Sequence, residues 1–307
     1  MLTSTHLERW ARLLAEYAVE ARAGQVVRIS AQPAGEPLLE AVYRAVLETG
    51  AHPIVRMQPE SLEEIFYDVA NEAQLDWENP FNAYETERID ASINIRTSIN
   101  LRAMDHVDPA RSQRAARARA GERSLFFDRA ALADAPELAP GGSPLRWSMT
   151  QFPTNAYAQF AGMSLKEYEG FVVKACQLDQ PDPIAFWQSL DAWQIQLAEV
   201  LNGGRELHFK APTGTDLRVA VDGMRWLSSP GRKNFPDGEV YSGPNLKADN
   251  GGAEGVVVFD RSTVYQGHRV SDVRIRMEQG RATEVTAGEG EAFLVKMLDQ
   301  DEGARRI

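Results

Sequence analysis

The fold is decided by residues 24–57, which read GQVVRISAQPAGEPLLEAVYRAVLETGAHPIVRM. The apolar run at 26–30 predicts a short buried strand, and 52–57 predicts a second one. Between them, residues 36–49 have helical periodicity, with Pro37 in the first turn and Gly50 after the end. A strand, a helix and another strand in this order indicate a parallel sheet with a crossover helix.

The segments on either side extend this pattern. Residues 5–22 predict an N-terminal helix, for which Thr5 and Glu8 are the expected capping box. After residue 206 the texture changes to short strands joined by Gly- and Pro-containing turns. We therefore predict an α/β fold, with an N-terminal parallel-sheet α/β domain at 1–185 and a β-rich α+β domain at 186–307. Further elements are expected as strands at 89–95, 145–150, 207–210, 217–221, 256–259, 270–277 and 283–286, and as helices at 60–70, 109–119, 168–175, 184–201 and 289–298.

Composition excludes several classes of function. The 307 residues include 33 Lys and Arg against 44 Asp and Glu, which gives a formal net charge of −11. An acidic chain repels phosphate backbones, so we expect no nucleic-acid partner. No apolar run is long enough to span a bilayer, so no membrane partner is expected, and there is no signal-peptide core. The single cysteine, Cys176, excludes an internal disulfide and favours a cytoplasmic protein.

Common catalytic motifs are missing from the sequence. Neither a G-x-G-x-x-G nor a Walker-type loop follows the early strands, so a nucleotide-binding protein is a hypothesis that rests on the strand–helix order alone. There is no H-E-x-x-H and no G-x-S-x-G motif. Cys176 is interpreted as a small core residue. The histidines are scattered and are interpreted as ordinary satisfied or exposed side chains: His6, His52, His106, His208 and His268.

The predicted helix at 109–119 is rich in arginine. Four arginines stand among its alanines, at positions 111, 114, 117 and 119. We interpret them as a solvated helix face. The alternative, an anion-binding patch, has no interleaved aromatic residues within the helix to support it.

One loop carries groups that could do chemistry. Residues 234–241 read NFPDGEVY and place two carboxylates and a glycine at the entry to an apolar, strand-like segment. Pro236 restricts the turn and Gly238 has access to unusual backbone angles, so Glu239 could be held rigidly at a sheet edge. A rigid carboxylate suits a hard or borderline cation. From composition alone, an ordinary surface turn is the simpler interpretation.

This segment resembles the Asn-(Phe/Met)-Pro-Asp-Gly-Glu-Val motif of the aminopeptidase T and aminopeptidase S family of dinuclear metallo-aminopeptidases. The resemblance extends over essentially the whole chain. Residues 24–27 and 50–51 look like the family's N-terminal strands and turns, and 146–159 are similar to its central Trp…Pro-Thr…Ala-Gln stretch. Residues 214–217 and 223–226 match the approach to the glutamate motif, and 299–306 look like the Asp-x-Asp-Glu-Gly-Ala-Arg-Arg signature.

The resemblance implies a metal-dependent aminopeptidase that releases N-terminal amino acids from short peptides. It implies two divalent ions, zinc or cobalt, with a bridging water, in a homodimer. Glu239 inherits the role of a metal ligand. Asp237 is expected to orient the loop, and Asn234 to fix the turn. The remaining ligands and a catalytic tyrosine lie beyond the 299–306 signature in the family, so no catalytic residue is assigned in this sequence.

The chain ends at Ile307, where the next ligand-bearing segment of the family would begin. We therefore expect the second domain to be incomplete at its C-terminus and this polypeptide to be inactive alone. The missing part would cover apolar surface around residues 256–259. The alternative is a non-catalytic, shortened family member that acts as a binding or interaction protein.

Overall fold

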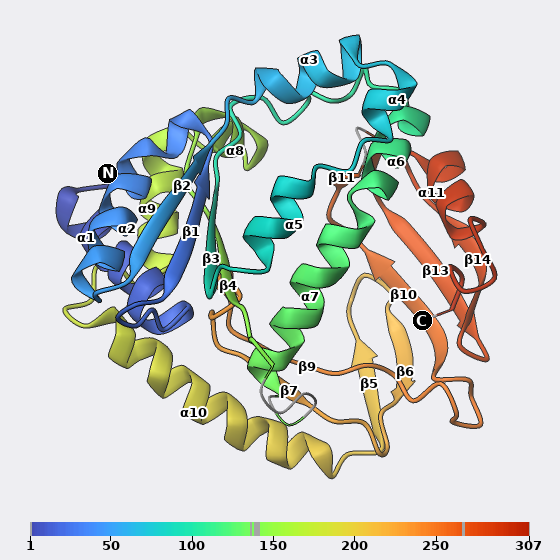
Figure 1. The fold of residues 1–307 in the computed structure, drawn as a ribbon. Coiled ribbons are helices and arrows are strands. Elements are labelled where there is room, and N and C mark those ends of the chain that lie inside the picture. Colours follow the sequence, from blue (N-terminus) through green and yellow to red (C-terminus); the bar gives the residue numbers. More distant parts are fainter. Residues whose placement is uncertain (1, 136, 138–141, 266–267, 307) are drawn as a thin grey trace. The chain divides into compact units, whose positions relative to one another are not determined.

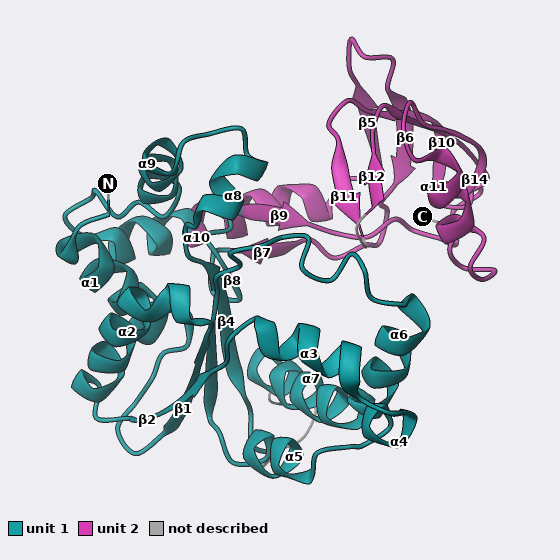
Figure 2. Ribbon diagram, turned by 90° about the horizontal axis from the view of Figure 1, so that it is seen from above, with its two compact units in different colours: residues 1–190, 230–238 teal, residues 191–229, 239–307 magenta. Residues whose placement is uncertain are grey.

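The computed structural model describes residues 2–135, 137, 142–265 and 268–306. The chain forms two compact units (Figure 2). Unit 1 comprises residues 1–190 and 230–238, and unit 2 comprises 191–229 and 239–307. Whether each unit is a domain that folds by itself stays a prediction.

Unit 1 is built on the predicted parallel sheet, which confirms the α/β fold. Its strands lie in the order β2-β1-β3-β4-β8 and all pairs are parallel. The buried positions of β1 alternate, which places Val27 and Ile29 in the core. The strands are β1 (Val26–Ala31), β2 (His52–Met57), β3 (Ala91–Arg96), β4 (Arg146–Gln151) and β8 (Asn234–Phe235).

Helices cover both faces of this sheet. The first helices and α9 lie on one side, and α5 and α7 lie on the other (Figures 1 and 2). Fully buried Trp10 and Leu14 fill the first layer. The α-helices of this part are α1 (Ser4–Arg12), α2 (Glu36–Glu48), α3 (Ser61–Val69), α4 (Glu72–Leu75), α5 (Pro80–Thr86), α6 (Pro109–Ala118), α7 (Ala120–Asp134), α8 (Asn155–Phe160) and α9 (Leu165–Ala175). The helix α10 (Pro183–Asn202) continues from unit 1 into unit 2.

The N-terminal helix begins and ends differently from the prediction. Thr3, not Thr5, is the N-cap, and it exchanges hydrogen bonds with His6 rather than with a glutamate. The imidazole nitrogen accepts from the backbone N–H of Thr3 just as a glutamate would in a capping box. After Arg12 the helix widens into a π-helical segment, Leu13–Ala18. Ser164 and Glu167 form a capping box of the ordinary kind before α9.

Unit 2 contains the predicted β-rich part. Its antiparallel sheet has the order β14-β13-β10-β6-β5, with the apolar side chains of Leu217, Ala253 and Met277 in its core. The predicted apolar strand at 256–259 belongs to the central strand of this sheet, although Phe259 at its end is 52% exposed. The sheet strands are β5 (Glu206–Lys210), β6 (Asp216–Ala220), β10 (Ala253–Phe259), β13 (Val273–Glu278) and β14 (Arg281–Thr286).

The remaining elements of unit 2 are two strand pairs and a helix. β7 (Leu227–Ser229) pairs with β9 (Glu239–Tyr241), and β11 (Thr263–Tyr265) pairs with β12 (His268–Val270). The helix α11 (Glu291–Leu298) precedes the last residues. There the Arg305 side chain donates to Asp299 at 2.6 Å and to the carbonyl of Ala282 at 2.9 Å, which ties the 299–306 segment to β14. No helix in the described part of the chain has the length and apolarity that a bilayer crossing requires.

Candidate functional site

The 234–241 segment begins as an edge strand of unit 1. β8 contributes only two residues to the sheet, pairing Asn234 with Met149 and Phe235 with Thr150. Phe235 is 2% exposed and its ring lies 5.2 Å from the ring of Trp187, centroid to centroid. Burial of a large aromatic side chain stabilises the strand end in place of a long ladder of backbone hydrogen bonds.

A chain of two buried hydrogen bonds, called the polar relay here, also holds β8 in place. The indole N–H of Trp10 donates to the hydroxyl of Thr150 at 3.2 Å, and that hydroxyl donates to the carbonyl of Phe235 at 2.8 Å. All three side chains are buried. Since each polar atom in the relay has its partner, burial there carries no penalty of an unmade hydrogen bond. The position of residue 235 is thus set by both packing and hydrogen bonding.

The turn that follows depends on glycine. The Phe235–Pro236 peptide is cis, and Gly238 has φ of +134°. This is a backbone conformation that residues with a Cβ rarely adopt. The N–H of Gly238 donates to the Asp237 carboxylate at 2.8 Å, so this carboxylate helps to hold the turn, as predicted. Asn234 is exposed and contributes its backbone to β8.

Glu239 lies where the chain enters unit 2. It opens β9 opposite Ser229 of β7, and its side chain is exposed. The neighbouring Ser228 hydroxyl lies 2.9 Å from the Asp191 carboxylate and 3.1 Å from the amide oxygen of fully buried Gln194, both on α10. These contacts anchor the strand pair to α10. The Glu239 carboxylate therefore projects from a short strand pair that is anchored to α10.

A complete metal centre is not gathered around this carboxylate. Within residues 2–135, 137, 142–265 and 268–306, no group of three His, Cys, Asp or Glu side chains is placed to hold a metal ion. His208 lies 2.6 Å from the Asp216 carboxylate, and its hydrogen bond lowers the pKa of Asp216. His268 stacks on Phe293 with 4.2 Å between ring centroids. The described residues thus do not by themselves fit a metal site, and the role of Glu239 as a ligand stays a prediction.

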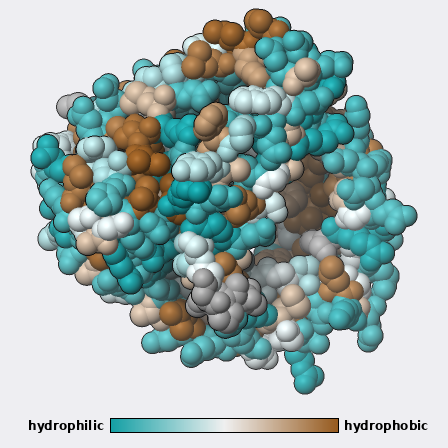
Figure 3. Space-filling model, in the orientation of Figure 1, coloured by the Kyte–Doolittle hydropathy of each residue, from teal (hydrophilic) through white to brown (hydrophobic). Residues whose placement is uncertain are grey.

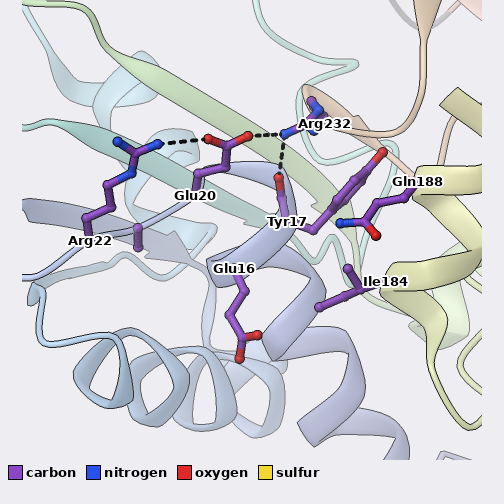
Figure 4. Close-up of a pocket in the computed structure, with 8 residues that line it drawn as sticks. Glu16, Tyr17, Glu20, Arg22, Ile184, Gln188 and Arg232 are labelled. Carbon is purple, nitrogen blue, oxygen red and sulfur yellow. Dashed lines mark hydrogen bonds and ion pairs between the residues drawn. The ribbon is translucent and has the colours of Figure 1, made fainter. Parts of the chain in front are cut away.

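Unit 1 also has a polar pocket of about 460 Å³ beside the π-helical segment (Figure 4). Three of its four charged residues pair with one another, since Glu20 lies 2.5 Å from Arg232 and 3.3 Å from Arg22, whereas Glu16 pairs with Arg12 outside the pocket. The Arg232 guanidinium also packs over the Tyr17 ring, 4.6 Å from its centroid. This pocket could not be predicted from the sequence, because nothing in the apolar periodicity separates a π-helix from an α-helix. The positive φ of Glu20, 46°, is likewise invisible in sequence.

The single thiol is not a nucleophile. Cys176 is fully buried, and burial raises the pKa of its thiol far above the ordinary range. This confirms the interpretation of Cys176 as a core residue.

Comparison with known proteins identifies the family. The family model described as "Thermophilic metalloprotease (M29)" matches residues 3–307. Aminopeptidase T from Thermus aquaticus is 34% identical over 178 residues, which cover 52% of this chain and 42% of that protein. Aminopeptidase 2 from Geobacillus stearothermophilus is 26% identical over 98% of this chain and 74% of its own length.

The fold agrees with this match. The solved structure titled wild-type AmpT from Thermus thermophilus superposes with a TM-score of 0.80 at 26% identity, covering 98% of this chain and 76% of that one. The matched stretch thus spans less than half of aminopeptidase T in sequence and about three quarters of aminopeptidase 2. The chain belongs to the thermophilic metalloprotease (M29) family.

Proposed function

We propose that this protein is a metal-dependent aminopeptidase that removes N-terminal amino acids from short peptides, and that Glu239 is one ligand of its metal centre. The match of the family model over residues 3–307 carries this proposal. The names of the relatives, aminopeptidase T and aminopeptidase 2, support the reaction class. The exposed carboxylate of Glu239 on a fixed strand pair supports the assignment of the ligand.

The proposed metal centre needs more ligands than the described residues provide. We propose two divalent ions, zinc or cobalt, with a water between them. One carboxylate cannot hold such a centre, since affinity comes from several ligands fixed together. The other ligands would come from sequence that the relatives possess outside the matched stretch. Within this chain, the role of the 234–238 segment is to position Glu239.

The experiment compares the 307-residue chain with the product of its source DNA read past codon 307. Hydrolysis of leucine p-nitroanilide and bound metal per chain are measured for both. We expect metal-dependent hydrolysis from a longer product only. In that longer product, Glu239→Gln should cause the loss of at least one bound metal ion. Glu278→Gln, an exposed carboxylate of the same unit, is the matched control. A stop codon after 307 in the native gene would instead favour a non-catalytic binding protein.

The proposal also includes a homodimer in the cytoplasm. Apolar side chains gather along α3, at the top of the view in Figure 3: Leu62, Ile65 and Val69 are 48%, 53% and 76% exposed. A contiguous apolar patch on a solvent-exposed surface is typical of an interaction site. Val69→Asp should reduce the mass measured by light scattering from that of a dimer to that of a monomer. A wild-type chain that is monomeric at high concentration would refute the dimer.

A further inference from the structure

Four of the five arginines of 109–123 fall into two groups, and the fifth, Arg117, donates to the backbone carbonyl of Gln113 on its own helix. Arg111 donates to the backbone carbonyls of Tyr67 and Ala70, at 3.0 and 2.6 Å. Arg114 lies 2.5 Å from Asp76 and also contacts Glu72. These two tie α6 to α3 and α4, so part of the predicted solvated face has a structural role.

The second group lines a cavity of about 390 Å³ in unit 1. Arg119, at the junction of α6 and α7, and Arg123, in the first turns of α7, are exposed at its edge. Arg28 of β1 is deeper, with a side chain 18% exposed. The remaining lining residues are Tyr67, Ala116, Glu122 and Phe126.

Positive charge in this cavity is only partly balanced. Glu122 is the one acidic residue among the seven that line it, and one of its oxygens already accepts from the Thr86 hydroxyl at 2.8 Å. Arg28 donates to the Ser92 hydroxyl at 3.3 Å and lies 3.9 Å from Glu85, whose other oxygen binds Arg56. In a chain of net charge −11, a cavity with three arginines and one glutamate is a local reversal of sign.

The guanidinium groups of Arg119 and Arg123, at the cavity edge, have N–H donors without a partner in the described ranges. Across the described ranges, the side chains of Arg119 and Arg123 have no hydrogen bond or ion pair, although each guanidinium offers five N–H donors. The Arg28 side chain is largely shielded from water, and this burial lowers the pKa of its guanidinium, so a bound anion would stabilise the charged form. Planar guanidinium groups suit oxyanions because they donate in pairs.

Aromatic side chains frame the same cavity. The Arg28 guanidinium lies 5.8 Å from the centroid of the Phe126 ring, and Arg119 lies 5.8 Å from that of Phe66. Tyr67 adds a further ring to the lining. The aromatic groups that the arginine helix lacks in sequence are thus supplied by α3 and α7. A cavity of this size and lining suits a ligand with an organic part.

We propose that this cavity binds a small organic oxyanion, a phosphate monoester or a carboxylate. Arg28, Arg119 and Arg123 hold its charged group, and its organic part packs against Phe126. The two chemistries share the oxyanion and differ in charge, so one experiment can distinguish them. The site is independent of the peptidase proposal, since it uses residues of unit 1 alone.

Isothermal titration calorimetry on the 307-residue chain tests the site. The probes are phenyl phosphate, phenylacetate and inorganic phosphate, with sodium chloride at matched ionic strength as the blank. We expect saturable binding of at least one aromatic probe with a Kd of about 1 mM or below. Phenyl phosphate as the tighter probe identifies a phosphate site, and phenylacetate identifies a carboxylate site. Inorganic phosphate should bind more weakly than phenyl phosphate, because it lacks the ring.

Charge-matched variants separate this site from general electrostatic attraction. Arg119→Gln and Arg123→Gln should each weaken binding about tenfold. Arg117→Gln removes the same charge near the end of α6, outside the cavity, and should leave the Kd within about twofold. Arg28→Lys, which keeps the charge but loses the planar fork, should also weaken binding. The proposal is overturned if no aromatic probe binds with a Kd of about 1 mM or below, or if Arg117→Gln weakens binding as much as Arg119→Gln.

Discussion

Replacing Phe235 by alanine tests whether burial of one side chain holds the 234–241 segment in place. β8 has only two residues, so its backbone pairing with β4 is short. The Phe235 side chain is 2% exposed and packs on Trp187 and, within the hydrophobic core, on the sheet of unit 1. Removal of the ring should therefore detach the segment that leads to Glu239.

The magnitude follows from the burial. Truncation of a buried phenylalanine costs about 3–5 kcal/mol, because apolar contact is lost and a cavity is left. The ring pair with Trp187 contributes about 0.5–1.5 kcal/mol of this. The edge of a sheet can relax inward more easily than its centre, so we place the loss of unfolding free energy at about 3 kcal/mol.

The assay is urea unfolding followed by circular dichroism, with Phe160→Ala as the control. Phe160 is 64% exposed on α8 in the same unit, and its truncation should cost less than about 1 kcal/mol. The midpoint for Phe235→Ala should fall with little change in slope. If both variants lose the same stability, packing of residue 235 does not hold this segment, and the reasoning fails.

Three further predictions concern other contacts. Thr150→Val keeps the shape but leaves the Trp10 indole N–H without its acceptor, so it should cost about 1–3 kcal/mol in urea unfolding, whereas an unchanged midpoint would contradict the relay. The hydrogen bond from Arg305 lowers the pKa of Asp299 in the folded chain. The stability that this hydrogen bond contributes is therefore present at neutral pH and is lost as the pH falls through the lowered pKa. The Tm difference between wild type and Asp299→Asn should shrink below about pH 4. Native Cys176 should resist a thiol reagent until urea unfolds the chain, and rapid labelling of the folded protein would show that its burial is transient.

The parallel sheet of unit 1 was predictable because each signal was local. Strand β1 is a compact apolar run, and α2 has Pro37 near its start and Gly50 after its end. The crossover order then fixes parallel pairing. β8 was not predictable, because two residues have no periodicity and their partner, Thr150, lies 85 positions away in the sequence. The same holds for the N-cap, where the choice of Thr3 over Thr5 depends on the side chain of His6.

The candidate residues divide in the same way. Glu239 was found through a resemblance, and its role stays a prediction. The cavity lined by arginines could not be predicted because its residues come from β1, α3, α6 and α7, and only the fold brings Arg28 near Arg119 and Arg123. Counting aromatic residues within one helix could not reveal rings supplied by its neighbours. A pattern search detects what one element presents, whereas a cavity is assembled from several.

The return of residues 230–238 to unit 1 has a consequence for biosynthesis. The chain emerges from the ribosome N-terminus first. Almost forty residues of unit 2 are therefore synthesised before the fifth strand of the parallel sheet is available. During that interval β4 is an open edge, and the Thr150 hydroxyl lacks the carbonyl to which it donates. Open edges invite pairing with other chains. Cutting the gene after residue 190 would make that interval permanent, so a stable fragment of unit 1 needs the 230–238 strand supplied in trans or fused back by a linker.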